Sequence, residues 1–225
     1  MISRKTNSRK NSLKSKDSLM KFIAWAVTAI VVILGIIAWA LPLKWHIFGT
    51  SIYLLFPIFG LVAFSLMWAQ YINSAVRQYL GLESSVLQQY TNVIGYLVLV
   101  AILLHPGLLI YQLWRNGFGL PPGSYLHYVL PNLKAFVILG SINLVVLLLF
   151  ELRRVLAKYS WWHYYTYLID IAMFSIFYHA LKLGTQIQGG WYRKVWFFYG
   201  ISLLVAILYI YKKRFLFKQT IKADK

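Results

Sequence analysis

Six long apolar segments constrain what this chain of 225 residues can fold into. Each segment is close to the ~20 residues that an α-helix needs to cross the hydrocarbon core of a bilayer. The segments run over residues 21–41, 50–72, 92–113, 132–152, 162–183 and 193–211. Only 12% of the residues are charged, whereas an average soluble domain has ~25%. We therefore predict an all-α, polytopic membrane protein built as a bundle of six transmembrane helices.

The basic residues predict how these helices are oriented in the membrane. The formal net charge is +18, and lysine and arginine gather at the N-terminus, around Arg153, Arg154 and Lys158, and in the C-terminal tail. Because cytoplasmic loops carry an excess of such residues, we expect both termini on the cytoplasmic side of the cell (plasma or inner) membrane. The same clustering argues against a surface for nucleic acid. The chain has no cysteine, which excludes disulfides and thiolate-bound clusters.

Three regions are expected along the chain. Residues 1–20 are polar and basic, and we expect a disordered cytoplasmic arm that contacts anionic lipid head groups, rather than a cleaved signal peptide. Residues 21–211 should form the transmembrane domain, and residues 212–225 a basic cytoplasmic tail. Gly-x-Gly occurs only at Gly117–Gly119, in a turn-rich loop, so we expect no flavin or nicotinamide site in this chain.

Ionisable side chains interrupt the fifth apolar segment. Asp170 lies in its middle, and His163 and His179 lie on either side. Such groups are costly in a spanning helix and mark a functional site more often than not. The third segment holds His105, in ILLHPGLL. Both helices are expected to run from the inside to the outside, so His105 and His179 should lie at similar depth in the outer half of the membrane.

From the residues alone, two interpretations of this histidine pair remain open. Two imidazoles from neighbouring helices can hold a six-coordinate haem iron. Alternatively, the two histidines are unrelated, and each is bonded to a backbone carbonyl or a neighbour. His46 and His127 fall outside the helix ends and are expected to be exposed. His163 is expected to be an interfacial residue, with a role as ligand of an inner cofactor as the alternative.

Three stretches of the chain resemble the ferric reductase-like transmembrane family, which includes the membrane parts of NADPH oxidases, ferric reductases and the haem subunit of bacterial methionine-sulfoxide reductase. They read GLVAFSLMWAQ, GYLVLVAILLHPGLL and SWWHYYTYLIDIAMFSIFYHALKLGT, and cover most of residues 60–185. The resemblance implies that His105 and His179 are the metal ligands of a haem b near the outer face. Family members with two haems carry a second histidine pair, and the matching positions here are Thr91 and Thr166. We therefore expect one haem, with the inner site lost.

Two cationic residues are candidates for binding the haem propionates. Arg115 and Lys182 lie near the outer ends of the third and fifth segments. Cationic side chains are the usual partners of paired carboxylates. The alternative for both is that they extend to the lipid head groups.

Asp170 is expected to belong to the emptied inner site. It follows Thr166 by one helical turn, so the two share a face of the helix. We expect this face to line the inner site, and Thr91, Thr166, Asp170 and aromatic side chains to fill the space of the missing haem. Water or Asn143 is the expected partner of the carboxylate. The alternative is that Asp170 is bonded locally and has a structural role.

These expectations define a function and its alternatives. A haem iron with two imidazole ligands has no free position for a substrate, so we expect outer-sphere electron transfer by an oxidoreductase component. The electron donor would be a separate flavoprotein reductase or a membrane quinol. The acceptor would be a ferric chelate, oxygen, a quinone or an external partner protein. One alternative is a haem-free descendant of the fold that acts as a membrane binding or scaffold protein. Another is a small transporter or channel, but no inverted repeat supports it.

Overall fold

The computed structural model describes residues 2–46, 49, 51–151, 156 and 158–223, and in these parts the chain is helical with no strand. The long helices are α1 (Ile2–Ala40), α2 (Ile52–Tyr79), α3 (Gln88–Arg115), α5 (Lys134–Glu151), α7 (Trp162–Leu183) and α8 (Gly190–Ala223). The connections contain the short helix α4 (Tyr125–Tyr128) and the 3-10 turns η1 (Ser84–Leu87), η2 (Pro131–Leu133) and η3 (Thr185–Ile187). The prediction of an all-α fold is confirmed.

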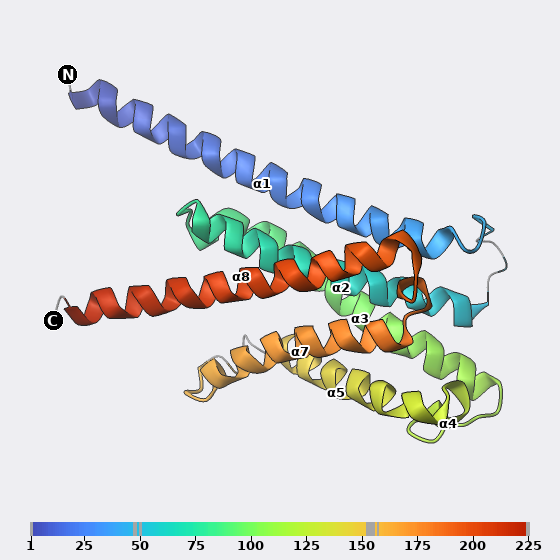
Figure 1. The fold of residues 1–225 in the computed structure, drawn as a ribbon. Coiled ribbons are helices and arrows are strands. Elements are labelled where there is room, and N and C mark those ends of the chain that lie inside the picture. The colour runs from blue at the N-terminus through green and yellow to red at the C-terminus, as the bar shows by residue number, and fades with distance from the viewer. Residues whose placement is uncertain (1, 47–48, 50, 152–155, 157, 224–225) are drawn as a thin grey trace.

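The helices identify the chain as a multi-pass membrane protein. Within the described residues, 5 helical segments are long and apolar enough to cross a membrane, and they belong to α1, α2, α3, α5 and α8. α7 is not among them, although its 22 residues are enough to span a bilayer. Its histidines, tyrosines, Asp170 and Lys182 lower its hydropathy. It nevertheless lies in the same bundle, alongside α5 (Figure 1).

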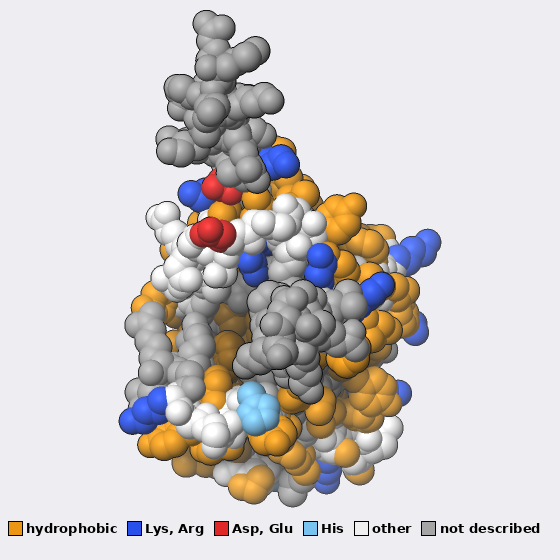
Figure 2. Space-filling view, turned by 90° about the vertical axis from the view of Figure 1, so that its left-hand side faces the viewer, with side chains coloured by type: hydrophobic (Ala, Val, Ile, Leu, Met, Phe, Trp, Pro, Cys, Tyr) orange, Lys and Arg blue, Asp and Glu red, His pale blue; other side chains and the backbone are white. Residues whose placement is uncertain are grey.

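The long helices alternate in direction, so both termini lie at the same end of the bundle (Figure 1). Figure 2 shows this end of the molecule, with lysine and arginine side chains at several places on it. Residues 2–20, for which a disordered arm was predicted, form the first part of α1, which begins at Ile2. No proline or glycine interrupts that segment. Likewise α8 continues through the basic tail to Ala223. Arg153 and Arg154 lie outside the described residues.

α2 is the centre of the larger part of the bundle, where it packs against α1, α3 and α8. Trp68 of α2 donates from Nε1 to the carbonyl oxygen of Tyr199 in α8, at 3.1 Å. The hydroxyl of Tyr90 in α3 bonds Thr28 of α1 at 2.6 Å and accepts from Asn73 of α2 at 3.0 Å. By contrast, α5 and α7 pack mainly against each other. The fold is therefore a unit of four helices with a helical hairpin, α5–α7, against it.

Candidate functional site

His105 projects from α3 and packs against α2. Its Nδ1 atom is 3.0 Å from the carbonyl oxygen of Phe56, and the Phe56 ring lies 5.2 Å from the imidazole, centroid to centroid. The imidazole covers Gly60, one turn further along α2. A Cβ atom at Gly60 would lie 2.8 Å from the Cε1 atom of His105. The ring can occupy this place because residue 60 has no side chain.

His179 is placed in the same way in the α5–α7 hairpin, where it projects from α7 and packs against α5. Its Nδ1 atom is 2.7 Å from the carbonyl oxygen of Phe136. A Cβ atom at Gly140 would lie 2.5 Å from the Cε1 atom of His179. The partner segments read FPIFG in α2 and FVILG in α5, so the carbonyl and the glycine have the same spacing in both. We call these two arrangements the glycine seats of the histidines.

The glycine seats determine which ring nitrogen of each histidine carries the proton. A carbonyl oxygen can only accept a hydrogen bond, so each neutral ring must carry its proton on Nδ1. The lone pair is then on Nε2, the form in which imidazole binds a metal ion. A bond from the other ring nitrogen to a carbonyl is the usual way in which proteins orient a ligating histidine.

The two expected propionate partners differ in their positions. The Nζ atom of Lys182 lies 5.7 Å from the ring centroid of Phe136, the residue whose carbonyl binds His179. It also lies 5.4 Å from the ring centroid of Tyr178. Arg115 is exposed at the end of α3, about 15 Å along the helix axis from His105. The structure therefore places Lys182, but not Arg115, beside its histidine.

The other histidines are not part of this arrangement. His163 is exposed, and its Nδ1 atom bonds the carbonyl oxygen of Ser160 in its own turn. This position agrees with an interfacial residue and not with a ligand inside the bundle. His46 and His127 are exposed, as predicted.

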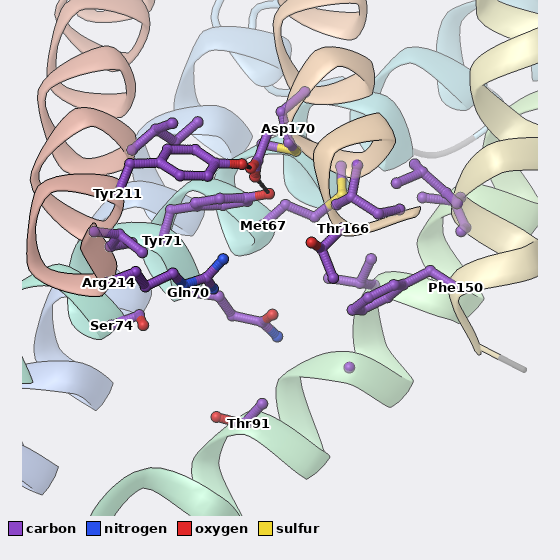
Figure 3. A pocket seen from close by; sticks show the side chains of 18 residues that line it. Met67, Gln70, Tyr71, Ser74, Thr91, Phe150, Thr166, Asp170, Tyr211 and Arg214 are labelled. Atoms are coloured by element: carbon purple, nitrogen blue, oxygen red, sulfur yellow. Dashed lines mark hydrogen bonds between the residues drawn. The ribbon is translucent and has the colours of Figure 1, made fainter. Parts of the chain in front are cut away.

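A cavity of about 350 Å³ lies where the α5–α7 hairpin faces α2, α3 and α8 (Figure 3). We call it the inner cavity. Thr91, Thr166 and Asp170 all line it. Thr91 is exposed, so the cavity is open at the rim that this residue forms. The sequence-based grouping of these three residues is thus reproduced, although they surround a space instead of filling it.

The prediction that Asn143 binds the Asp170 carboxylate is wrong. Tyr71 of α2 donates to Oδ1 of Asp170 at 2.6 Å, and Tyr211 of α8 donates to Oδ2, as Figure 3 shows. Asn143 instead donates to the hydroxyl of Ser175, at 2.7 Å. The reason is that Asn143 meets α7 at Ser175, which lies more than one helical turn after Asp170. The two tyrosines instead come from helices on the other side of the cavity. Sequence spacing carries no signal for such contacts between distant helices.

Two further polar residues that the sequence analysis did not single out complete the cavity. Arg214 lines it, and its guanidinium lies 5.7 Å from the ring centroid of Tyr211. Gln70 also lines it, and its side-chain nitrogen is buried with no hydrogen-bond partner among the described residues. In Figure 3 the Gln70 amide projects into the open space between Arg214 and Thr91.

Within the described residues, no three histidine, aspartate or glutamate side chains gather as ligands for a bare metal ion. The two seated imidazoles form a pair rather than such a cluster. In comparisons with known proteins, no family model, curated protein or solved structure matches the chain. The resemblance to the ferric reductase-like family therefore stays a prediction.

Proposed function

We propose that the chain is a membrane electron carrier that holds one haem b between His105 of α3 and His179 of α7. The observation that carries the proposal is the pair of matching glycine seats. Each seat fixes an imidazole with Nδ1–H on a carbonyl and leaves Nε2 for the iron. Two unrelated histidines would have no reason to share this arrangement, one against α2 and the other against α5.

The residues present fit a haem in two further respects. The two ligands come from the two units of the fold, His105 from the four-helix unit and His179 from the α5–α7 hairpin. Lys182 supplies a positive charge beside His179, suited to a propionate. Arg115, exposed at the same end of the bundle, would be a more distant positive charge.

The bound haem would supply a reversible one-electron couple. His105 and His179, each held in one tautomer by its carbonyl bond, would both bind the iron and would so exclude substrate from it. Electrons would then be exchanged at the haem edge. We propose that the protein lies in the cell membrane with its termini in the cytoplasm. The donor would be a flavoprotein reductase or a quinol, and the acceptor a ferric chelate, oxygen, a quinone or an external protein.

The test is the haem content and optical spectrum of the full chain purified in detergent from cells supplied with haem. We expect about one haem per chain, with the sharp reduced α band of a low-spin iron that has two imidazole ligands. Two haems per chain would contradict the loss of the inner site. A colourless protein would refute the electron carrier and favour the haem-free scaffold.

A further inference from the structure

The inner cavity has apolar walls and one polar end. The walls include side chains from four helices: Val98, Ile102, Leu147, Met173 and Ile207. At the polar end, Asp170, Gln70 and Arg214 come together from α7, α2 and α8 (Figure 3). An occupant that matches both parts is soluble in the membrane and carries oxygen atoms on a compact head group.

The polar end offers both an acceptor and a donor to such an occupant. Each oxygen of Asp170 accepts one phenol hydrogen bond, and a carboxylate has about four acceptor positions, so acceptor capacity remains. The Gln70 nitrogen is a buried donor without a partner. A donor left in that state costs free energy, and a ligand oxygen would relieve it. The site therefore suits an oxygen that is a hydroxyl in one state and a carbonyl in another.

We propose that the inner cavity binds the head group of an isoprenoid quinol or quinone. A quinol hydroxyl would donate to Asp170, and a quinone carbonyl would accept from Gln70. A cavity of about 350 Å³ has room for one such ring. A phospholipid phosphate could pair with Arg214, but it would bring a negative charge to Asp170 and has no proton to donate to that carboxylate, so it suits the site less well.

The cavity also reaches the neighbourhood of the proposed haem ligand on α3. Its α3 lining residues Thr91, Gly95, Val98 and Ile102 recur every three or four residues, and His105 continues the same face. Ile102 precedes His105 by less than one turn, about 4.5 Å along the axis. The polar end is further away, because Asp170 precedes His179 by nine residues, about 13.5 Å along α7. A quinol head group bound there would lie on the inner side of the electron carrier, and the apolar wall of the cavity would connect the two. This step rests on the proposed function, whereas quinone binding does not.

The electron transfer can be written as a balanced reaction. Oxidation of the quinol to the quinone breaks its two O–H bonds. The protons pass by way of Asp170 to water at the end where Arg214 is exposed. The two electrons pass one at a time to external one-electron acceptors, so two ferric chelates, for example, are reduced for each quinol.

The test of the site is binding of decylubiquinone, a quinone with a short tail, to the purified full chain, measured by equilibrium dialysis. We expect saturable binding to the wild type. Gln70→Leu and Asp170→Asn should each weaken it about tenfold, the effect of losing one good hydrogen bond. Thr91→Trp, at the rim, should block it. Gln112→Leu, which removes an exposed amide of α3 outside the cavity, should leave binding unchanged.

Three results would overturn the site, and the first two are no saturable binding to the wild type and binding that Gln70→Leu and Thr91→Trp both leave unchanged. Displacement of the quinone by phosphatidylglycerol at equal concentration would also overturn it, because the cavity would then be a lipid site. Thermal unfolding of each variant shows whether it is folded, and Gln70→Leu still tests the site if Asp170→Asn does not fold.

Failure of the site and failure of the proposed function can be told apart. His105→Ala should bind decylubiquinone as the wild type does, because that residue does not line the cavity. Decylubiquinol should reduce the haem of the wild type but not that of Thr91→Trp, whereas dithionite should reduce both. A wild type that binds quinone but no haem would refute the proposed function and leave the quinone site standing.

Discussion

Replacing either His105 or His179 with alanine is expected to abolish haem binding. Each imidazole would supply one of the two axial bonds, and no other histidine lies in the described part of the bundle interior to replace it. Loss of a residue that only hydrogen-bonds a metal ligand already lowers metal affinity about 10–100-fold. Loss of the ligand itself should therefore have a larger effect on haem affinity. The measurement is haem per chain, with the reduced-minus-oxidised spectrum, for each variant purified in the same way.

The matched control for these variants is His163→Ala. His163 is exposed and bonded within its own turn, so its removal should leave the haem content and the α band unchanged. Low-spin haem that persists in His105→Ala or in His179→Ala would remove that residue from the site. A loss of haem in His163→Ala with the other two intact would reverse the assignment.

The helices could be predicted from the sequence because a spanning helix must satisfy two simple physical conditions. It needs about 20 apolar residues, and its backbone must form its own hydrogen bonds. The fifth segment, 162–183, coincides with α7. The same conditions say nothing about polar residues next to a span. Residues 2–20 continue α1 because no helix-breaking residue interrupts them, and polar composition alone predicted disorder instead.

The sequence could predict only those features of the candidate site that depend on the spacing of residues within one helix. The spacing of Thr166 and Asp170 placed both on one face of α7, and both line the inner cavity. The partners of Asp170 could not be found in this way, because Tyr71 and Tyr211 are distant in sequence and meet Asp170 only through helix packing.

A different signal in the sequence could have led to the glycine seats. Phenylalanine followed four residues later by glycine occurs as Phe56 and Gly60 in the second apolar segment and as Phe136 and Gly140 in the fourth. In a membrane bundle, small residues mark places where another group approaches the backbone closely. Comparison of the two segments would have suggested that each of them receives a large side chain from the next spanning helix.

Enlarging the glycine seats is therefore expected to displace the imidazoles without removing them. In Gly140→Val, the new Cβ would start 2.5 Å from the Cε1 atom of His179, so the ring must move and give up its bond to the Phe136 carbonyl. Gly60→Val should act on His105 in the same way, from 2.8 Å. We expect each change to weaken haem binding about 10–100-fold, the range observed for lost outer-shell partners of metal ligands. Titration of the haem-free protein with haemin measures the affinity.

Gly107→Val is the matched control, because it makes the same exchange in the span that carries His105, where nothing lies within 4 Å of the added Cβ. Its affinity and spectrum should equal those of the wild type. A shift from low-spin to high-spin haem in Gly60→Val and Gly140→Val, but not in Gly107→Val, would show that the seats hold the axial ligands. Wild-type affinity and a low-spin spectrum in both seat variants would contradict that role. If the chain is instead a haem-free scaffold, the seat variants should differ from Gly107→Val only in thermal stability, because the glycines then serve packing alone.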